Sequence, residues 1–166
     1  MITKKICMLG AFAAGKSCLV RKFVHSIFDD RYLSTLGVKI SKKDVNVGGK
    51  DLSLVLWDME GKDAYTEVNI SYLRGAMGFF VVADGTRRQT LDVALELRNA
   101  ALDATAPDLP HCLLVNKADL VEEWELSRDD IEALRNLGFN VFITSAKSGQ
   151  FVEEAFMRLA KDMLKI

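Results

Sequence analysis

A segment near the N-terminus has the residue types and spacing that bind phosphate. Residues 10–17 are Gly-Ala-Phe-Ala-Ala-Gly-Lys-Ser, which matches the pattern G-x-x-x-x-G-K-[ST]. The glycines allow backbone N–H groups to turn inward around an oxyanion, and the start of a following helix adds partial positive charge. Lys16 would then reach the β- and γ-phosphates of a nucleotide, and the Ser17 hydroxyl would ligate Mg²⁺. The alternative is a glycine-rich turn between a strand and a helix without a ligand.

Two polar segments directly follow apolar runs further along the chain. Asn116-Lys117-Ala118-Asp119 follows residues 111–115, and Ser145-Ala146-Lys147 follows residues 139–144. Ligands bind at the C-terminal edge of a doubly wound sheet, where such segments would meet. We therefore expect the two segments to lie together at a ligand site on that edge. The alternative for Asn116, Lys117 and Asp119 is a simple capped turn.

The elements that must position these segments alternate along the chain. Apolar runs predict strands at 6–9, 38–47, 52–57, 77–83, 111–115 and 139–144. Helical spacing of apolar residues predicts helices at 16–25, 91–102, 127–138 and 152–163. Gly48-Gly49 indicates a hairpin between the second and third strands. Strands separated by helices predict an α/β fold of three layers: a mostly parallel six-stranded sheet, with one antiparallel strand and helices on both faces.

Composition limits the possible classes of protein. The chain has 166 residues, 49% of them hydrophobic, and a net charge of −1, so we expect one domain over 1–166 and no nucleic-acid binding through bulk charge. The three cysteines form no CxxC pair, which disfavours a zinc site or a disulfide framework and suits the cytoplasm. No apolar run reaches the roughly 20 residues of a membrane span, and no lipidation motif is present. We therefore expect a cytoplasmic protein without its own membrane anchor.

The order of the motifs resembles the small GTPases of the Ras superfamily over essentially the whole chain. Besides the segments above, it includes Thr35 in the loop after the first helix and D-x-x-G at Asp58–Gly61. Residues 34–38 and 71–76 look most like the Rab branch. The resemblance implies a P-loop G domain that binds GTP or GDP with Mg²⁺. It also implies an exchange factor, an activating protein and an effector, which would bind through switch I (about 26–37) and switch II (about 59–75).

The resemblance also assigns roles to individual residues. The implied nucleotide contacts are Gly10, Ala13, Ala14, Gly15, Lys16, Ser17, Cys18, Phe28, Thr35, Asp58, Gly61, Asn116, Lys117, Asp119, Ser145, Ala146 and Lys147. The implied Mg²⁺ ligands are Ser17, Thr35 and Asp58, and the implied catalytic positions are Lys16, Thr35, Gly61 and Lys62. The Asp119 carboxylate would accept from N1–H and the 2-amino group of guanine, whereas adenine would leave its charge unpaired at a cost of about 1–3 kcal/mol or more. Phe28 would cover the base, and the Ala146 N–H would meet guanine O6. Loss of the γ-phosphate would loosen both switch loops.

Three residues depart from the family pattern. Lys62 replaces the glutamine that orients the attacking water, and an ammonium cannot accept a proton from that water. Phe12 stands where a glycine is frequent, and Glu60 adds negative charge near the γ-phosphate. We predict slow intrinsic GTP hydrolysis and a poor response to an activator that inserts an arginine. The plainer interpretations are a solvated Lys62 and a Phe12 ring that covers switch residues.

Two other functions compete with a GTP-hydrolysing switch. Glu60 and Lys62 favour a pseudo-GTPase, an interaction module that binds nucleotide without significant hydrolysis. A P-loop kinase or ATPase is disfavoured by the N-K-x-D segment. The sequence assigns no role to Trp124, and the basic pairs, Arg87-Arg88 among them, are interpreted as solvated.

Overall fold

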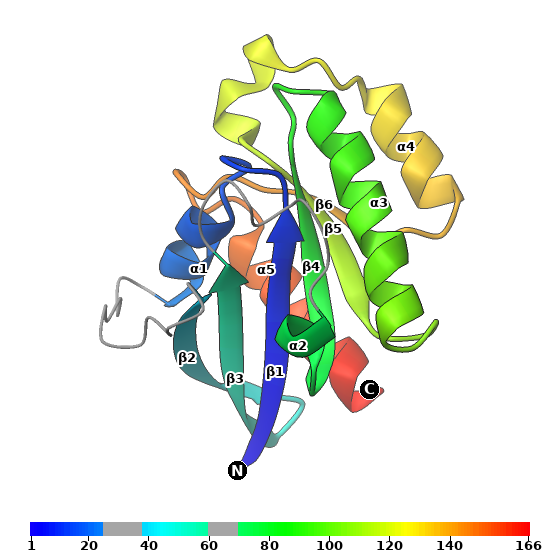
Figure 1. The fold of residues 1–166 in the computed structure, drawn as a ribbon. Coiled ribbons are helices and arrows are strands. Elements are labelled where there is room, and N and C mark those ends of the chain that lie inside the picture. The colour runs from blue at the N-terminus through cyan, green and yellow to red at the C-terminus, as the bar shows by residue number, and fades with distance from the viewer. Residues whose placement is uncertain (25–37, 60–69) are drawn as a thin grey trace.

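The computed structural model describes residues 1–24, 38–59 and 70–166. It confirms the predicted α/β fold, with six strands in the order β2-β3-β1-β4-β5-β6 (Figure 1). The strands are β1 (Ile2–Gly10), β2 (Val38–Val47), β3 (Lys50–Met59), β4 (Ala76–Asp84), β5 (His111–Asn116) and β6 (Val141–Ile143). The helices are α1 (Lys16–Val24), α2 (Ile70–Leu73), α3 (Gln89–Ala104), the 3₁₀ helix η3 (Ala118–Glu123), α4 (Arg128–Asn136) and α5 (Val152–Leu164).

The predicted hairpin supplies the one antiparallel pair. Val38 of β2 lies opposite Met59 of β3, and Val47 lies opposite Lys50. Gly48 and Gly49 connect the two strands with φ values of 58° and 83°, which glycine adopts without steric cost. All other neighbouring strands are parallel. The parallel strands therefore end at one common edge of the sheet, where those predicted site residues that the structure describes lie.

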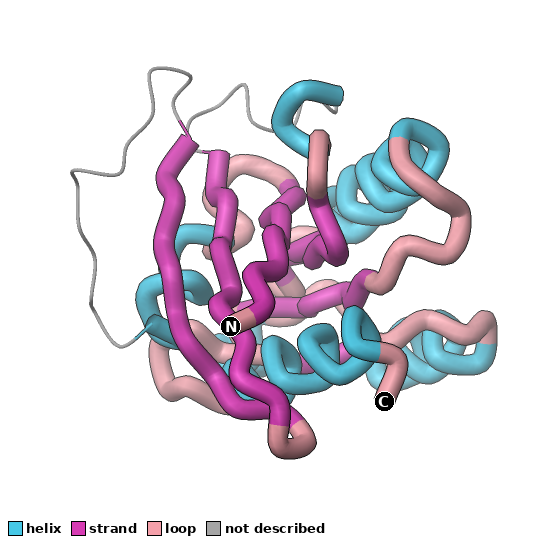
Figure 2. The backbone as a smooth tube through the Cα atoms, turned by 90° about the horizontal axis from the view of Figure 1, so that it is seen from below, coloured by secondary structure: helices cyan, strands magenta, loops and turns pink. Residues whose placement is uncertain are grey.

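Helices cover both faces of the sheet (Figure 2). Alternate residues of β1 divide between the two cores, as the two-residue period of a strand requires. Ile6 and Met8 join the core that α1 and α5 cover, whereas Cys7 and Leu9 join the core that α3 and α4 cover. Within the described segments, no helix combines the length and apolarity needed to cross a bilayer.

Some boundaries differ from the sequence prediction. β1 begins at Ile2 rather than at residue 6, because the neighbouring strand β3 pairs with the polar start of β1 as well. β6 is only three residues long and begins after Asn140. A capping box begins α4: the Ser127 hydroxyl accepts from the Asp130 N–H, and the Asp130 carboxylate accepts from the Ser127 N–H.

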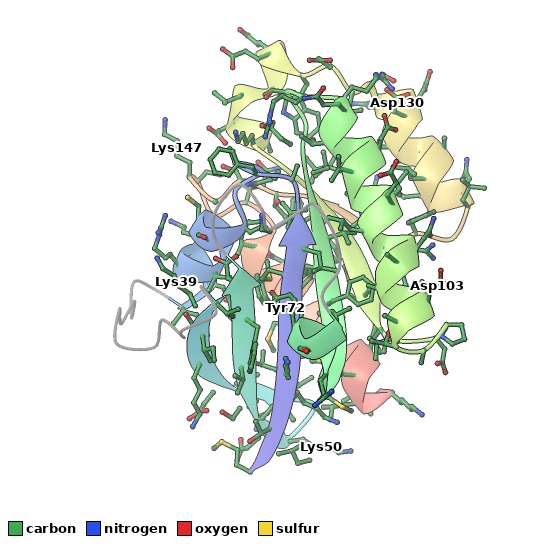
Figure 3. The ribbon with its side chains drawn as sticks, in the orientation of Figure 1. Lys39, Lys50, Tyr72, Asp103, Asp130 and Lys147 are labelled. Atoms are coloured by element: carbon green, nitrogen blue, oxygen red, sulfur yellow. The ribbon has the colours of Figure 1, made fainter. Side chains whose placement is uncertain are left out.

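The helices α2 and η3 were not predicted. α2 contacts the sheet through Tyr72, which lies over β1 (Figure 3). The Tyr72 hydroxyl accepts from the Met8 N–H at 3.2 Å and lies close to the carbonyls of Met8 and Trp57. A four-residue helix is too short for apolar periodicity to reveal it.

Candidate functional site

The loop between β1 and α1 has the close approaches expected of a phosphate loop. Gly10 has a φ of 153°, and a Cβ atom there would lie 2.5 Å from the carbonyl oxygen of Val82. A Cβ atom on Gly15 would collide with the side-chain amide of Asn116. Both glycines are therefore required by the backbone, and the second brings the loop against the predicted base pocket.

Lys16 binds the first two residues of this loop. Its side chain is buried, and Nζ donates to the carbonyls of Gly10 at 3.1 Å and Ala11 at 3.3 Å. Burial lowers the pKa of Lys16, and attraction to Asp58 opposes that effect. A buried ammonium held only by neutral carbonyls favours an anion as its ligand, because an anion adds the attraction of opposite charges to the hydrogen bond.

Two of the implied Mg²⁺ ligands meet at the start of α1. The Ser17 hydroxyl donates to the Asp58 carboxylate, which is buried at the end of β3. A hydroxyl and a carboxylate supply the oxygen ligands that Mg²⁺ prefers, together with waters and phosphate oxygens. These residues therefore fit the metal.

The segments 116–119 and 145–147 form what we call the base side of the site, and Asn116 connects them to the phosphate loop. Its Nδ2 donates to the Ala14 carbonyl at 3.1 Å, and its Oδ1 accepts from Thr144 at 3.2 Å and from the Ala146 N–H at 3.3 Å. The Ala146 N–H that was expected to meet guanine O6 thus donates to Asn116 in this structure. Asn116 ties the phosphate loop to the S-A-K segment.

Asp119 and Ser145 form a second base-side pair. The Ser145 hydroxyl donates to Asp119 Oδ1 at 2.8 Å, and the Ser148 N–H donates to Ser145 Oγ at 3.0 Å. Asp119 is exposed, while Ser145 is buried beneath it. The carboxylate is therefore held at the surface by a buried partner, with acceptor capacity left for a base. Lys147, the last residue of the S-A-K segment, is exposed.

Lys117 is fixed at both ends by contacts that the sequence did not reveal. Its backbone is left-handed, with a φ of 73°, and its carbonyl accepts from Trp124 Nε1 at 2.9 Å. Its Nζ lies 2.8 Å from Asp84 Oδ2. The Trp124 ring packs directly against Gly85, where a Cβ atom would not fit. Trp124 therefore supports the base-side loop.

Asp84 is the functional-site residue that the sequence analysis missed. It is fully buried at the end of β4 and accepts from Lys117, Thr86 and Arg87. Burial alone would raise its pKa, but these hydrogen bonds outweigh burial and lower the pKa. Its position directly after an apolar strand, as for Asn116, is the signal that could have identified it.

Arg87 was interpreted as solvated, and the structure corrects that interpretation. Its Nε donates to Asp84 Oδ2 at 3.0 Å and its Nη2 donates to the Phe12 carbonyl at 2.9 Å. Arg88 points elsewhere and pairs with Asp130 at 2.7 Å. The Phe12 side chain is 44% exposed. Two neighbouring arginines thus have different surroundings, and only Arg87 contacts the phosphate loop.

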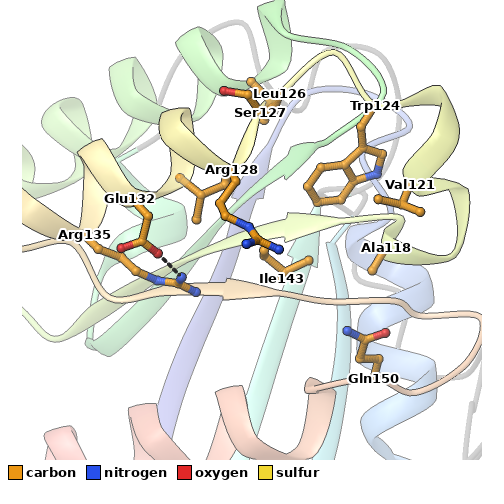
Figure 4. A pocket seen from close by; sticks show the side chains of 11 residues that line it. Ala118, Val121, Trp124, Leu126, Ser127, Arg128, Glu132, Arg135, Ile143 and Gln150 are labelled. Carbon is orange, nitrogen blue, oxygen red and sulfur yellow. Dashed lines mark hydrogen bonds and ion pairs between the residues drawn. The ribbon is translucent and has the colours of Figure 1, made fainter.

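A separate cavity of about 590 Å³ adjoins the base side. Figure 4 shows Trp124 at the end near Ala118 and the ion pair between Glu132 and Arg135 at the opposite end. Its lining includes Ala118 but none of residues 10–17. The cavity therefore does not extend into the phosphate loop.

Four predicted site residues are not placed by the structure. Phe28, Thr35, Gly61 and Lys62 lie outside the described residues, as do most of the expected switch segments. Ala13, with a φ of 62°, and Cys18, on the first turn of α1, are exposed, and Ala14 is buried. The described residues thus bring together the phosphate loop, the Ser17–Asp58 pair and the base-side segments.

Comparison with known proteins agrees with this arrangement. The model of the Ras family matches residues 5–165. The chain is 32% identical to Ras-related protein Rab-13 of Canis lupus familiaris over 161 residues, which cover 96% of this chain and 79% of that protein. It is 32% identical to human Ras-related protein Rab-8B, covering 96% of this chain and 78% of that protein. It is 33% identical to Ras-related protein Rab-8 of Diplobatis ommata, covering 96% and 77%. The chain belongs to the Ras family of small GTPases and is Rab-like.

Proposed function

We propose that this Ras-family protein binds GTP and GDP with Mg²⁺ through the residues at the common strand edge, and that it hydrolyses GTP slowly. The observation that carries the proposal is the connection of the buried Lys16 loop to the Asn116 and Asp119 segments at one edge of the sheet. Family membership supports a nucleotide-binding switch with GTP hydrolase activity. The residue roles and the low rate are the finer part of the proposal.

The phosphate side would use the loop and its helix. Lys16 binds the β- and γ-phosphates, the backbone N–H groups of residues 13–18 bind phosphate oxygens, and Ser17 and Asp58 hold Mg²⁺ together with Thr35. Bound Mg²⁺ neutralises charge on the phosphates. Thr35 and Gly61 would contact the γ-phosphate and so order the two switch segments, where an exchange factor, an activating protein and an effector would bind.

The base side would supply selectivity. The Asp119 carboxylate accepts from N1–H and the 2-amino group of guanine, and the Lys117 stem lies over the ring with Phe28 on the other side. Lys117 is already held by Asp84 and Trp124, and Asp119 by Ser145. Binding a base therefore costs little ordering of these side chains. We infer that residues 1–166 form one G domain that contains both sides.

Slow hydrolysis follows from Lys62. Without the glutamine, no side chain at that position accepts a hydrogen bond from the attacking water, because an ammonium only donates. Glu60 adds repulsion toward the γ-phosphate. The second candidate, a pseudo-GTPase, is favoured by these same two residues and differs in having no significant turnover.

Nucleotide binding is tested by identifying what the purified protein retains. The protein is denatured, and released nucleotide is separated by ion-exchange chromatography, before and after long incubation with Mg²⁺. The proposal expects GTP or GDP, with GTP converting slowly to GDP, and displacement by added GTP but not by ATP. Equal displacement by ATP would contradict it. Retained GTP that never converts, even with candidate activators, would favour the pseudo-GTPase.

A further inference from the structure

Two cationic side chains hold consecutive carbonyls of the phosphate loop. Lys16 donates to the carbonyls of Gly10 and Ala11, and Arg87 donates to the next carbonyl, that of Phe12. Lys16 comes from the helix that follows the loop, whereas Arg87 comes from a segment 75 residues away. The loop is therefore flanked by positive charge from two separate parts of the chain.

The backbone and side chain of Arg87 are both fixed. Its N–H donates to the Asp84 carbonyl at 3.0 Å, and its carbonyl accepts from the buried Thr90 hydroxyl at 2.7 Å. Asp84 binds Nε, which sets the plane of the guanidinium. A guanidinium has five N–H donors, and these side-chain contacts use two of them. Donors therefore remain for a further acceptor at the loop.

We propose that Arg87 is an arginine supplied by the chain itself to the γ-phosphate of GTP, a role that rests on the proposed nucleotide site. The Phe12 carbonyl is a neutral acceptor, whereas a phosphate oxygen is anionic and adds the attraction of opposite charges and a matching geometry to the hydrogen bond from the guanidinium. The γ-phosphate therefore competes effectively for Nη2, while Asp84 keeps Nε in place.

The role of Arg87 in the reaction is electrostatic. Water oxygen bonds to the γ-phosphorus, and the bond from that phosphorus to the β,γ-bridging oxygen breaks with its electron pair on GDP. One water proton stays on the released phosphate, and the other passes to solvent. Arg87 keeps all of its protons and stabilises charge on the transferred group, as an arginine does in other phosphoryl-transfer sites. The absent glutamine still leaves the water unoriented, so overall turnover stays slow.

The alternative is that Arg87 only supports the shape of the loop. A support would affect GDP and GTP equally, because both use the loop's backbone. A charge directed at the γ-phosphate would spare GDP and affect the transition state most. Arg88 provides the matched control, since it is a neighbouring arginine that pairs with Asp130 instead of the loop.

The test measures a transition-state mimic as well as turnover. Wild type and variants are loaded with fluorescent N-methylanthraniloyl-GDP and Mg²⁺, aluminium fluoride is added without an activator, and complex formation is followed by fluorescence. We expect wild type and Arg88→Ala to form the complex. We expect Arg87→Ala to lose it while its GDP affinity changes little, and to lower single-turnover GTP hydrolysis about 10²-fold, less than the 10³–10⁵ of a complete arginine site. Arg87→Lys should recover part of both signals, and Arg87→Gln, which keeps a donor but no charge, should recover neither.

Three results would overturn the proposal. Wild type could bind GDP but form no aluminium fluoride complex, or Arg87→Ala could form the complex normally. The third is an Arg87→Ala variant that loses GDP affinity to the same extent as it loses the complex. If Arg87→Ala fails to fold, the Lys and Gln variants decide in the same way. A wild-type protein that binds no guanine nucleotide would instead refute the proposed function itself.

Discussion

On the base side of the site, polar side chains bind one another, whereas on the phosphate side the two cationic side chains bind backbone carbonyls, next to the Ser17–Asp58 pair. Asn116 and Asp119 are held by Thr144 and Ser145. Lys16 and Arg87, in contrast, donate to loop carbonyls. The base-side residues are thus held by other side chains, while the cations of the phosphate side are held by neutral carbonyls, which an anion could replace as the acceptor. Under the proposed function, base selectivity and phosphate chemistry would use different parts of the site.

Asp84 joins these two sides. Its carboxylate accepts from Lys117 on the base side and from Arg87 on the phosphate side. The register of the sheet explains the position, because Asp84 of β4 lies opposite Asn116 of β5. One buried carboxylate therefore orients a cation in each region.

The largest effect on binding is expected from Lys16→Ala. Removing a buried charge that pairs with phosphate costs about 2–5 kcal/mol, which is about a 30- to 4,000-fold loss of GTP affinity. Titration calorimetry measures it, with Lys22→Ala, an exposed lysine on the same helix, as the control. An affinity equal in both variants would show that the loop does not bind the phosphates.

Asp84→Asn should weaken both sides at once. It leaves Lys117 and Arg87 without their carboxylate, and we expect a loss of about 3 kcal/mol in the free energy of unfolding, the lower end for a broken buried pair because both cations are partly exposed. Because folding lowers the pKa of Asp84, its contribution is complete above the unfolded value of 3.8 and is lost as the pH falls through the folded pKa.

Denaturant unfolding of wild type and Asp84→Asn at several pH values measures this contribution. The difference between them should shrink on acidification. A difference that is independent of pH down to the acid-unfolding range would contradict the assigned ion pairs.

Asp119→Ala should change selectivity more than stability. Loss of a hydrogen bond to a charged group costs about 1.5–3 kcal/mol, or about a 10- to 150-fold loss of GTP affinity. Inosine triphosphate lacks the 2-amino group, so wild type should prefer GTP to it and the variant should not. Glu122→Ala, an exposed carboxylate on η3, should keep the wild-type preference. If Asp119→Ala still distinguishes the two nucleotides, the base pocket is assigned to the wrong residue.

The smallest effect concerns His111, which lies at the opposite end of β5 from Asn116. Burial lowers its pKa, Leu109 opposes this and Arg98 adds to it. The unfolded chain therefore takes up a proton first, so the free energy of unfolding should decrease as the pH falls below about 6.5. His111→Asn should remove this component without changing GTP affinity. A changed affinity would mean that the two ends of β5 are not independent.

Local patterns were sufficient to predict the strands, the hairpin and the motif residues. Apolar runs identify buried strands, and the polar segments that follow them predict which edge of the sheet would bind a ligand. The contacts of Asp84, Arg87 and Trp124 were not predictable in this way. Arg87 meets Phe12 across 75 residues, and Asp84 meets Lys117 only because of the register between β4 and β5. Such pairings depend on tertiary structure, which no sequence period encodes.

The central claim, a guanine-nucleotide switch with slow hydrolysis, is tested most directly by single-turnover hydrolysis of GTP in wild type and Lys62→Gln. We expect wild type to bind GTP with Mg²⁺ and to hydrolyse it more slowly than the roughly 4 × 10⁻⁴ s⁻¹ of a small GTPase that has the glutamine. We expect Lys62→Gln to be about 10²-fold faster than wild type, the lower end of what a well-positioned catalytic group contributes. A wild-type rate equal to that of the glutamine-containing enzyme, unchanged in Lys62→Gln, would contradict it.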